Sequence, residues 1–513
     1  MGPTTAPKEL NNHDTMSLTA TDPDGPSVDA QRNPETDVEK TVVAQLDPST
    51  ADSQWDGPDD PGNPLNWPAR KRNAQVIVVA GLMLAVNLAS TMFAPAAGQL
   101  MDEFGFTSHA VASLTVSIYV LGFALGPLLW APLSEMYGRL VVYLVSTVLF
   151  LAFLLGTAFA ANLGQFMAFR VLSGGTGGAS LALCGGTLAD VVPREHRGKW
   201  MSLFVLGPLL GPIIGPVMGG FIAQDVGWRW VFRVIAIATG VCLALIFAFL
   251  CETFAPVLLR RKARARARAQ AKDEPEPATY VEKPDIGAEL RRGIVRPLKL
   301  LVLSPIVLLL SLYTAFYFGL IFLLFTTFST VYMDQYGWST SISGLSYLGM
   351  GVGMGAGLAA QARLSDQFIR QRTAKNGVSK PEDRLVLMAI MSPSIPIGMF
   401  WYGWAADKQT HWIVPILGTV FIGVGMIFTM LPVLVYLVDC FGAEAAASAM
   451  AANTFMRSIA GAFLPLAGPA LYEALGLGWG NSLLGFLGLA MLPIPWVFYL
   501  YGEKIRLSRK ITL

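Results

Sequence analysis

Residues 76–97 read VIVVAGLMLAVNLASTMFAPAA and contain no charged side chain. A second charge-free stretch, residues 235–250, reads IAIATGVCLALIFAFL. Apolar runs of about 20 residues match the thickness of the hydrocarbon core of a bilayer. Alternating period-2 segments are absent, which disfavours a membrane β-barrel. Backbone groups inside lipid must then be satisfied within helices, so these stretches predict an all-α membrane protein.

The composition of the whole chain agrees with this fold class. Of the 513 residues, 53% are hydrophobic and 14% are charged. Soluble proteins carry roughly a quarter charged residues, so this chain has too little charge to cover a surface that faces water. We predict 12 transmembrane helices in two six-helix repeats, at 74–98, 109–132, 140–160, 164–191, 200–223, 229–252, 304–333, 340–362, 384–406, 412–439, 445–471 and 480–502.

The distribution of Lys and Arg predicts the orientation of these helices. With both termini in the cytoplasm, 32 basic residues fall on the cytoplasmic side and only 2, Arg229 and Lys408, fall outside. Because positively charged loops stay on the cytoplasmic side of a membrane, we expect both termini to be cytoplasmic. The plasma membrane is the expected location, with a vacuolar or vesicular membrane as the alternative.

Composition also divides the chain into five parts. Residues 1–73 hold 13 acidic residues and lack apolar periodicity, which predicts a disordered acidic cytoplasmic tail. The remaining parts are a six-helix bundle at 74–252, a basic cytoplasmic linker at 253–303, a second six-helix bundle at 304–502 and a cytoplasmic tail at 503–513.

The linker carries a concentrated basic run. Residues 260–268 read RRKARARAR. A basic run can bind nucleic acid, but one that directly follows a membrane helix more often attracts anionic lipid headgroups. We therefore expect a bilayer with anionic headgroups, and no nucleic acid, as the partner of this segment.

A short motif occurs once in each half of the chain. Residues 133–139 read LSEMYGR and residues 364–370 read LSDQFIR, 231 positions later. Each copy follows the second predicted helix of its half. Two parallel six-helix repeats indicate alternating access, with a substrate site between the halves near the midplane. The acid and the Arg of such a loop can lock helix ends together in one conformation and release them in the other.

The fifth predicted helix carries glycine at every fourth position. Such a row makes a smooth face that lets another helix approach closely, and proline adds a kink. We expect this helix to pack at a moving interface through Gly207, Gly211, Gly215, Pro216, Gly219 and Gly220.

Charged and polar residues inside predicted spans are candidates for the substrate site, because an intramembrane cation faces a cavity or a partner. Arg170 and Arg457 are such cations. Each could instead tie helices together, and the aromatic candidates could belong to packing or to the interfacial belt. The full candidate set is Asn87, Arg170, Tyr313, Phe316, Tyr317, Trp404, Asn453 and Arg457.

Enzymatic and ATP-driven functions find no support in the sequence. Walker A, Ser/His/Asp, HExxH and paired-acid patterns are absent, and the four cysteines form no CxxC pair. The glycine-rich residues 173–178 (SGGTGG) lie inside an apolar helix without a preceding strand, which argues against a nucleotide loop. We expect no catalytic residues, no metal site and no cofactor.

Several segments resemble the major facilitator superfamily, specifically the fungal branch of 12-spanner drug:proton antiporters. Residues 132–139 (PLSEMYGR) look like motif A, 170–178 (RVLSGGTGG) look like motif B, and the glycine row at 207–220 looks like motif C, the antiporter signature. NPLNW at 63–67, GWRW at 227–230 and CETFAP at 251–256 also look like segments of that branch. The resemblance covers about residues 63–502. Motif A usually has Asp in place of Glu135 and a second base in place of Leu140.

The resemblance implies the major facilitator fold and proton-coupled export of a small organic compound, such as a fungal secondary metabolite, toxin or drug. It also implies a proton-coupling role for the buried Arg of motif B. The expected residues for conformational and proton coupling are Glu135, Arg139, Arg170, Asp190, Asp366 and Arg370.

The charges inside the predicted spans bear on the substrate. Two intramembrane Arg and no acid near the midplane favour anionic or neutral molecules over polyamines. An organic-acid transporter of the same fold is the alternative, and a non-transporting membrane sensor is a third hypothesis. We expect small-molecule substrate and protons as partners, and a monomer.

Overall fold

The computed structural model describes residues 55–193, 197–270, 286–376 and 380–508. Within these ranges every regular element is a helix, as the apolar stretches predict. The first half contains α2 (Ala69–Thr91), α3 (Ala97–Phe104), α4 (His109–Tyr137), α5 (Arg139–Ala158), α6 (Leu163–Val191), α7 (Arg197–Val226) and α8 (Trp228–Phe249). The connection contains α9 (Ala255–Gln270) and α10 (Ile286–Leu303). The second half contains α11 (Pro305–Tyr336), α12 (Thr340–Ser343), α13 (Tyr347–Asn376), α14 (Leu385–Met391), α15 (Ser394–Asp407), α16 (Ile413–Phe463), α17 (Ala467–Met491) and α18 (Pro493–Ser508). Short 3-10 helices are η2 (Pro64–Asn66), η3 (Ala94–Ala96), η5 (Gly344–Ser346), η6 (Pro381–Arg384) and η7 (Leu464–Leu466).

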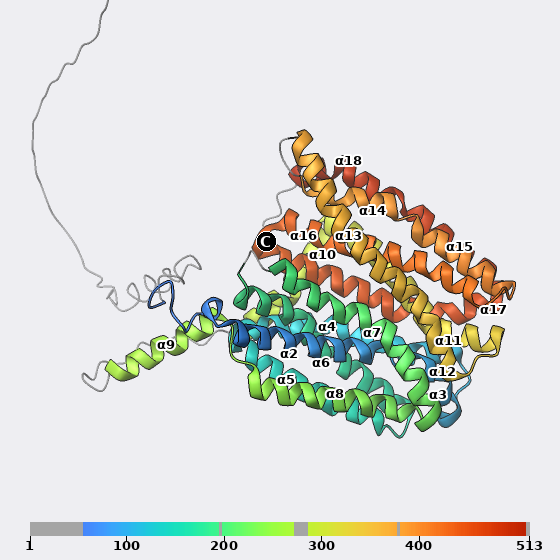
Figure 1. The fold of residues 1–513 in the computed structure, drawn as a ribbon, viewed down its shortest axis with the longest axis horizontal. Coiled ribbons are helices and arrows are strands. Elements are labelled where there is room, and N and C mark those ends of the chain that lie inside the picture. Colours follow the sequence, from blue (N-terminus) through green and yellow to red (C-terminus); the bar gives the residue numbers. More distant parts are fainter. Residues whose placement is uncertain (1–54, 194–196, 271–285, 377–379, 509–513) are drawn as a thin grey trace, which may run out of the picture. The chain divides into compact units, whose positions relative to one another are not determined.

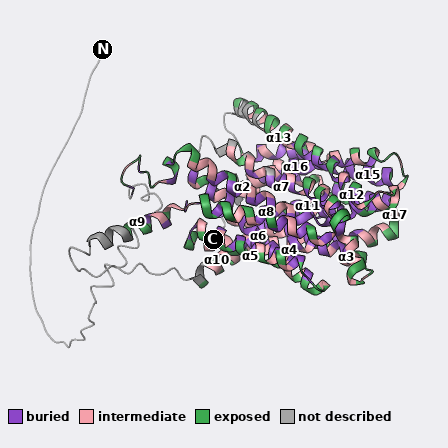
Figure 2. Ribbon diagram, turned by 60° about the horizontal axis from the view of Figure 1, so that its bottom comes forward, coloured by how far each residue is buried: buried purple, intermediate pink, exposed green. Residues whose placement is uncertain are grey.

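The helices of each half pack mainly against one another. In Figure 1, α2 to α8, in blue to green, lie together, and α11 to α18, in yellow to red, lie beside them. Large apolar side chains nevertheless face outward: Phe159 is 67% exposed and Phe247 is 68% exposed. Figure 2 shows buried residues between the helices and exposed ones on their outer faces. An apolar outer face is what a protein surrounded by lipid requires.

In the part of the chain that the structure describes, ten segments are long and apolar enough to cross a membrane. One of them, Ala445–Arg506, joins the last two predicted spans. The predicted span 164–191 is missing from the ten, although α6 has 29 residues. Its Gly, Ser and Thr residues lower its mean hydropathy. The total of twelve spans therefore stays a prediction.

Helix α16 doubles back on itself. A straight helix would place Met430 and Arg457 about 40 Å apart, at 1.5 Å per residue. Nη1 of Arg457 instead lies 3.9 Å from Sδ of Met430. The chain therefore reverses between these residues, and the two apolar segments that meet there, Ile413–Phe441 and the start of Ala445–Arg506, lie side by side. We call them the first and second arms of α16.

The part of the predicted disordered tail that the structure describes is more ordered than expected. Residues 55–73, assigned to a disordered tail, form turns, η2 and the start of α2, whereas residues 1–54 lie outside the described residues. The linker contains α9 and α10. Capping explains part of the order, since Oδ1 of Asn63 accepts the N–H of Leu65 and satisfies one free donor of the short helix.

The two copies of the seven-residue motif have different structures, so the expectation that both form inner loops is wrong. In the first copy α4 ends at Tyr137, Gly138 turns with φ 96°, and α5 begins at Arg139. The second copy lies within α13, which continues to Asn376. Ile369 occupies the position equivalent to Gly138. A β-branched residue is a strong outlier at positive φ, so the helix continues there.

Candidate functional site

A polar cluster lies where α4, α6 and α8 end and α5 begins, at the predicted cytoplasmic side. Nε of Arg139 lies 3.4 Å from Oδ2 of Asp190, and Nη1 of Arg139 donates to Oγ of Ser134. Oγ1 of Thr253 donates to the same Asp190 oxygen over 3.3 Å. Arg139 and Asp190 were both expected to take part in conformational coupling, and the structure brings them together.

Glu252 holds the amino end of α5. Its carboxylate accepts the backbone N–H groups of Arg139 at 2.9 Å and Leu140 at 3.2 Å. It also accepts the N–H groups of Thr253 at 3.1 Å and Phe254 at 3.0 Å, and only 4% of Glu252 is exposed. A carboxylate at a helix N-terminus stabilises it by roughly 0.3–2 kcal/mol. Glu252 belongs to the CETFAP segment at 251–256, whose sequence does not reveal this role.

Two neighbours fix the plane of the Arg139 guanidinium. Its central carbon lies 4.8 Å from the centre of the Phe254 ring. A Cβ at Gly186 would lie 2.7 Å from Nη2. A larger residue at position 186 would therefore displace the Arg139 side chain.

The second half has its own ion pair at the equivalent place. Nε of Arg384 lies 2.6 Å from Oδ2 of Asp439. Arg384 begins the third predicted span of its half and Asp439 ends the fourth. In the first half, Arg139 directly precedes the third predicted span and Asp190 is the second-last residue of the fourth. The motif comparison missed this pair because it aligned Arg139 with Arg370.

The remaining coupling candidates are Glu135, Asp366 and Arg370. Glu135 is exposed on the last turn of α4. The backbones of Asp366 and Arg370 belong to α13, but their side chains lie outside the described residues.

Arg170 is completely buried and ties three helices together. Nη1 donates to the carbonyl of Ala89 at 2.7 Å and Nη2 to that of Val116 at 3.0 Å, with longer contacts to Ser90 and Thr115. The acceptors belong to α2 and α4, whereas Arg170 belongs to α6. Arg170 therefore cannot bind substrate in this conformation, because each of its three side-chain nitrogens already donates a hydrogen bond to a carbonyl group.

Arg457 and Asn453 form a different arrangement on the second arm of α16. Nδ2 of Asn453 donates to Oγ1 of Thr314 at 2.7 Å. The Arg457 guanidinium carbon lies 5.1 Å from the centre of the Phe318 ring, and Nη1 contacts Met430. The structure thus brings two substrate candidates together with α11 residues that sequence analysis had not selected.

The aromatic candidates separate into two places. Tyr313 and Tyr317 are fully buried, and Oη of Tyr317 donates to the carbonyl of Gly488 in α17 at 3.0 Å. Phe316 packs against Tyr317. Trp404 is 36% exposed and donates to Oγ of Ser482 at 3.0 Å. Trp404 therefore lies between α15 and α17 at the outer surface, away from the Arg457 cluster, which fits the belt alternative.

The glycine row of α7 packs directly on α2. A Cβ at Gly211 would lie 2.6 Å from Cβ of Asn87, and one at Gly219 would lie 1.7 Å from the carbonyl oxygen of Met92. Asn87, a substrate candidate, therefore packs in this contact, and its Nδ2 donates to the carbonyl of Met83 at 2.8 Å. The same row continues through Gly207, facing Met83, and Gly215, facing Thr91 and Met92.

The other face of α7 contacts the second half. A Cβ at Gly220 would meet the carbonyl of Thr340, and one at Gly344 would meet that of Pro216, at 2.7 and 2.5 Å. Oε1 of Gln224 accepts the N–H of Ser341 at 2.9 Å. These contacts gather at the predicted outer ends of α7 and α12.

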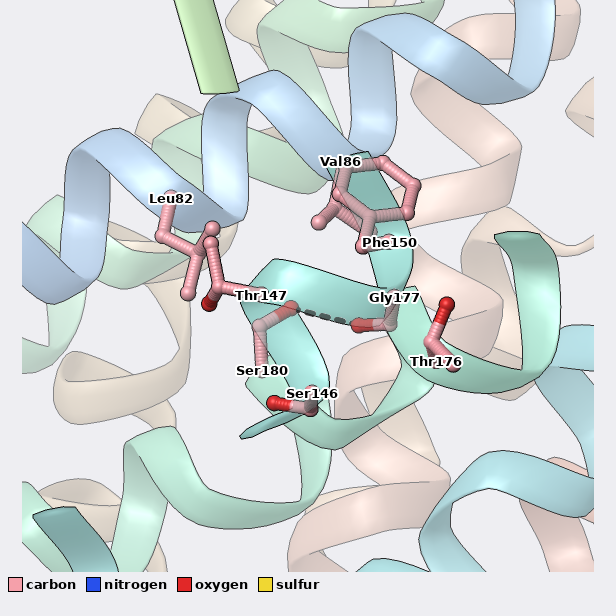
Figure 3. Close-up of a pocket in the computed structure, with 8 residues that line it drawn as sticks. All are labelled: Leu82, Val86, Ser146, Thr147, Phe150, Thr176, Gly177 and Ser180. Carbon is pink, nitrogen blue, oxygen red and sulfur yellow. Dashed lines mark hydrogen bonds between the residues drawn. The ribbon is translucent and has the colours of Figure 1, made fainter. Parts of the chain in front are cut away.

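A small pocket between α2, α5 and α6 is shown in Figure 3. Its hydroxyl groups come from Ser146, Thr147, Thr176 and Ser180, and Ser180 donates to the carbonyl of Gly177 at 2.8 Å. These side chains leave no room for a water molecule between them. The pocket therefore cannot hold a substrate in this conformation.

Comparison with known proteins agrees with this architecture. The sequence profile of the Major Facilitator Superfamily matches residues 79–465. The chain is 52% identical over 486 residues to MFS transporter fsa7 of Fusarium sp. (strain FN080326), covering 94% of each chain. It is 48% identical over 474 residues to the Trichosetin biosynthesis cluster MFS transporter of Gibberella fujikuroi (strain CBS 195.34 / IMI 58289 / NRRL A-6831), covering 92% of each.

Solved structures show the same fold at low sequence identity. A D-xylose-proton symporter matches with a TM-score of 0.64 and 18% identity, over 83% of this chain and 97% of that one. The xylose transporter XylE from E. coli, in a partially occluded inward-open conformation, also matches with a TM-score of 0.64 and 18% identity, over 84% and 98%. The chain therefore belongs to the Major Facilitator Superfamily, and it is a multi-pass membrane transporter rather than an enzyme.

Proposed function

We propose that this transporter exports a small organic compound by proton-coupled alternating access. The observation that carries the proposal is an asymmetry between the two ends of the helices. At the predicted outer end the halves touch directly through α7 and α12. At the predicted inner end each half carries its own ion pair, Arg139–Asp190 or Arg384–Asp439. These pairs can hold helix ends within one half and exchange partners when the inner end closes.

Asp190 is our candidate for the group that exchanges the proton. Its carboxylate lies 3.4 Å from Nε of the Arg139 guanidinium, and Thr253 donates a hydrogen bond to the same oxygen. Protonation of Asp190 would remove the attraction to Arg139 and free the end of α5. In this proposal, proton exchange is coupled directly to movement of the helix ends at the predicted inner end.

The proton gradient is large enough for export. One charge crossing 100 mV contributes about 2.3 kcal/mol, and one pH unit contributes about 1.4 kcal/mol. Together they support a solute gradient of several hundredfold per proton.

One relative, the Trichosetin biosynthesis cluster MFS transporter of Gibberella fujikuroi, supports a fungal metabolite as the exported compound. An organic-acid transporter is the second candidate, and Arg457, which forms no ion pair among the described residues, favours it. We further propose that the protein acts as a monomer in the plasma membrane, with the exposed Arg260 and Arg261 of α9 near anionic headgroups.

Accumulation assays test this function. Labelled organic acids, neutral metabolites and cationic drugs are given at pH 5 and 7.5 to yeast that lacks its own exporters, with and without this chain. We expect lower accumulation of at least one compound, and we expect a protonophore to abolish the difference. Export that persists after the proton gradient collapses would disprove proton coupling.

The Asp190→Asn variant tests the proposed proton-exchange group. We expect it to lose uphill export while still exchanging labelled for unlabelled solute across the membrane. Glu473→Gln is the matched control, because Glu473 is an exposed acid at the predicted outer end. Wild-type uphill export by Asp190→Asn would exclude Asp190 as the proton carrier.

A further inference from the structure

Two side chains on α16 and two on α11 face one another in matched pairs. Asn453 and Arg457 are four residues apart, as are Thr314 and Phe318, so each pair shares one helix face. Asn453 contacts Thr314 at 2.7 Å and, over 3.4 Å, Oγ of Ser311. Arg457 lies over the Phe318 ring. The second arm of α16 thus presents an amide and a guanidinium to the same face of α11.

The first arm of α16 also contacts this cluster. Sδ of Met430 lies 3.9 Å from Nη1 of Arg457. The neighbouring Thr429 is fully buried, and its hydroxyl lies near that of Tyr313. Gly461, one turn beyond Arg457, leaves room for Phe318, since a Cβ there would lie 2.9 Å from the Phe318 ring.

The polar atoms of this cluster are poorly satisfied. Nε of Arg457 and Oδ1 of Asn453 are shielded from solvent and have no hydrogen-bond partner among the described residues. The hydroxyls of Tyr313 and Thr429 are in the same state. Among these residues Arg457 contacts only a thioether and an aromatic ring, whereas Arg170 donates to four carbonyl groups. A partly buried cation whose Nε is shielded from solvent and has no acceptor is costly, so the cluster is suited to receive an acceptor group.

We propose that Arg457 and Asn453 form the head-group subsite for an organic acid anion on an apolar body. This inference rests on the proposed transport function and names its substrate class. The guanidinium fork matches a carboxylate or another oxyanion. Oδ1 of Asn453 accepts a hydrogen bond from a hydroxyl or N–H group beside the anion. Phe318 and Met430 supply apolar walls for the adjoining carbon skeleton.

Arg457 is half-buried, while Asn453 lies deeper with 1% exposed. The anion would therefore meet Arg457 first, and the neighbouring donor group would reach Asn453. This order predicts that loss of Arg457 removes binding of the acid as a class. Loss of Asn453 instead removes the preference for acids that carry an adjacent donor.

The test measures binding to the purified full chain with four acid–amide pairs, among them salicylate with salicylamide and benzoate with benzamide. Binding is read from the ligand-induced rise in Tm as a function of concentration. We expect the acid to bind more tightly than its amide in at least one pair, and Arg457→Gln to weaken that acid by about tenfold or more. Arg457→Lys should restore part of the loss. Because salicylate carries a hydroxyl beside its carboxylate, we expect the wild type to bind it more tightly than benzoate, and we expect Asn453→Leu to abolish this difference.

Lys408→Gln is the matched control, because it removes a cation that is exposed at the predicted outer end. It should bind every ligand as the wild type does. Equal binding of acids and amides in all pairs, or unchanged acid binding by Arg457→Gln, would overturn the subsite. Proton-dependent export of a neutral compound that survives in Arg457→Gln would show that transport stands even if the subsite fails.

Discussion

Gly138 determines the shape of the turn between α4 and α5 at the predicted inner end. Its φ of 96° and ψ of 163° lie in a region that essentially only glycine occupies. A Cβ at this position would also lie 2.2 Å from Oε2 of Glu252. The turn between α4 and α5, and the approach of Glu252 to the start of α5, therefore both depend on the missing side chain.

We expect Gly138→Ala to destabilise the protein by about 1–3 kcal/mol through backbone strain and to reduce transport further by displacing Glu252. The measurements are Tm of the purified protein and initial transport rate. Gly240→Ala is the control, because a Cβ there meets nothing within 4 Å and alanine favours a helix. Wild-type Tm and transport in Gly138→Ala would show that the turn has another solution.

Arg170 should behave as a structural residue. Lysine keeps the charge but cannot reach carbonyls on both α2 and α4, because it carries a single ammonium group. We expect Arg170→Lys to lower Tm and the yield of folded protein while the ratio of acid to amide binding stays at the wild-type value. A changed ratio at unchanged Tm would instead place Arg170 in the substrate site.

At the scale of elements, α9 is attached to the segment that precedes α2. In Figure 1, α9 lies apart from the other helices. Nζ of Lys262 lies 2.6 Å from Oδ2 of Asp56 and 2.5 Å from Oδ2 of Asp60. We call this contact the α9 clasp. One cation of the basic run is thereby held by acids of the chain itself, while Arg260 and Arg261 stay exposed.

The clasp should persist throughout the physiological pH range. The hydrogen bond from Lys262 lowers the pKa of Asp60 from 3.8 to about 2, and the two acids raise the pKa of Lys262 above 10.5. A lowered acid pKa adds stability above about pH 4 that is lost as the pH falls toward 2. A raised lysine pKa adds stability that is lost only as the pH rises beyond 10.5.

Hydrogen exchange of residues 55–67 measures this stability. We expect slow exchange at pH 5 and 8 after correction for the intrinsic rate, faster exchange at high salt because exposed ion pairs are screened, and faster exchange in Lys262→Gln. Arg261→Gln serves as the control from the same helix. Equal protection in Lys262→Gln and wild type would show that other contacts hold the segment.

At the scale of the whole molecule, alternating access requires the contacts between α7 and α12 to separate. We expect a disulfide between Gln224→Cys and Ser341→Cys, in a background without the four native cysteines, to hold the outer end closed. Oxidation should stop transport and reduction should restore it, as followed by uptake into vesicles. Gln224→Cys alone, treated in the same way, controls for oxidation. Full transport by the cross-linked protein would contradict opening at this end.

Much of the architecture could be predicted from local sequence. Apolar runs predicted the helices because helix formation in lipid depends on the length and polarity of one segment. The glycine row of α7 likewise predicted a close contact, since a helix face is determined by residue spacing. The failures occurred where a partner is distant in sequence: the motif copy suggested Arg370, but Arg384 pairs with Asp439.

The sequence by itself determined the all-helical membrane architecture, the glycine face of α7 and the presence of cations in apolar surroundings. Only the tertiary structure decided that Arg170 is saturated by carbonyl groups while Arg457 lacks an acceptor among the described residues. It also decided that Glu252 caps α5 and that α16 reverses. Hydropathy and helical period are properties of a single segment. Hydrogen-bond partners, in contrast, depend on which segments meet after packing, and the residues next to a side chain in sequence do not determine which segments meet.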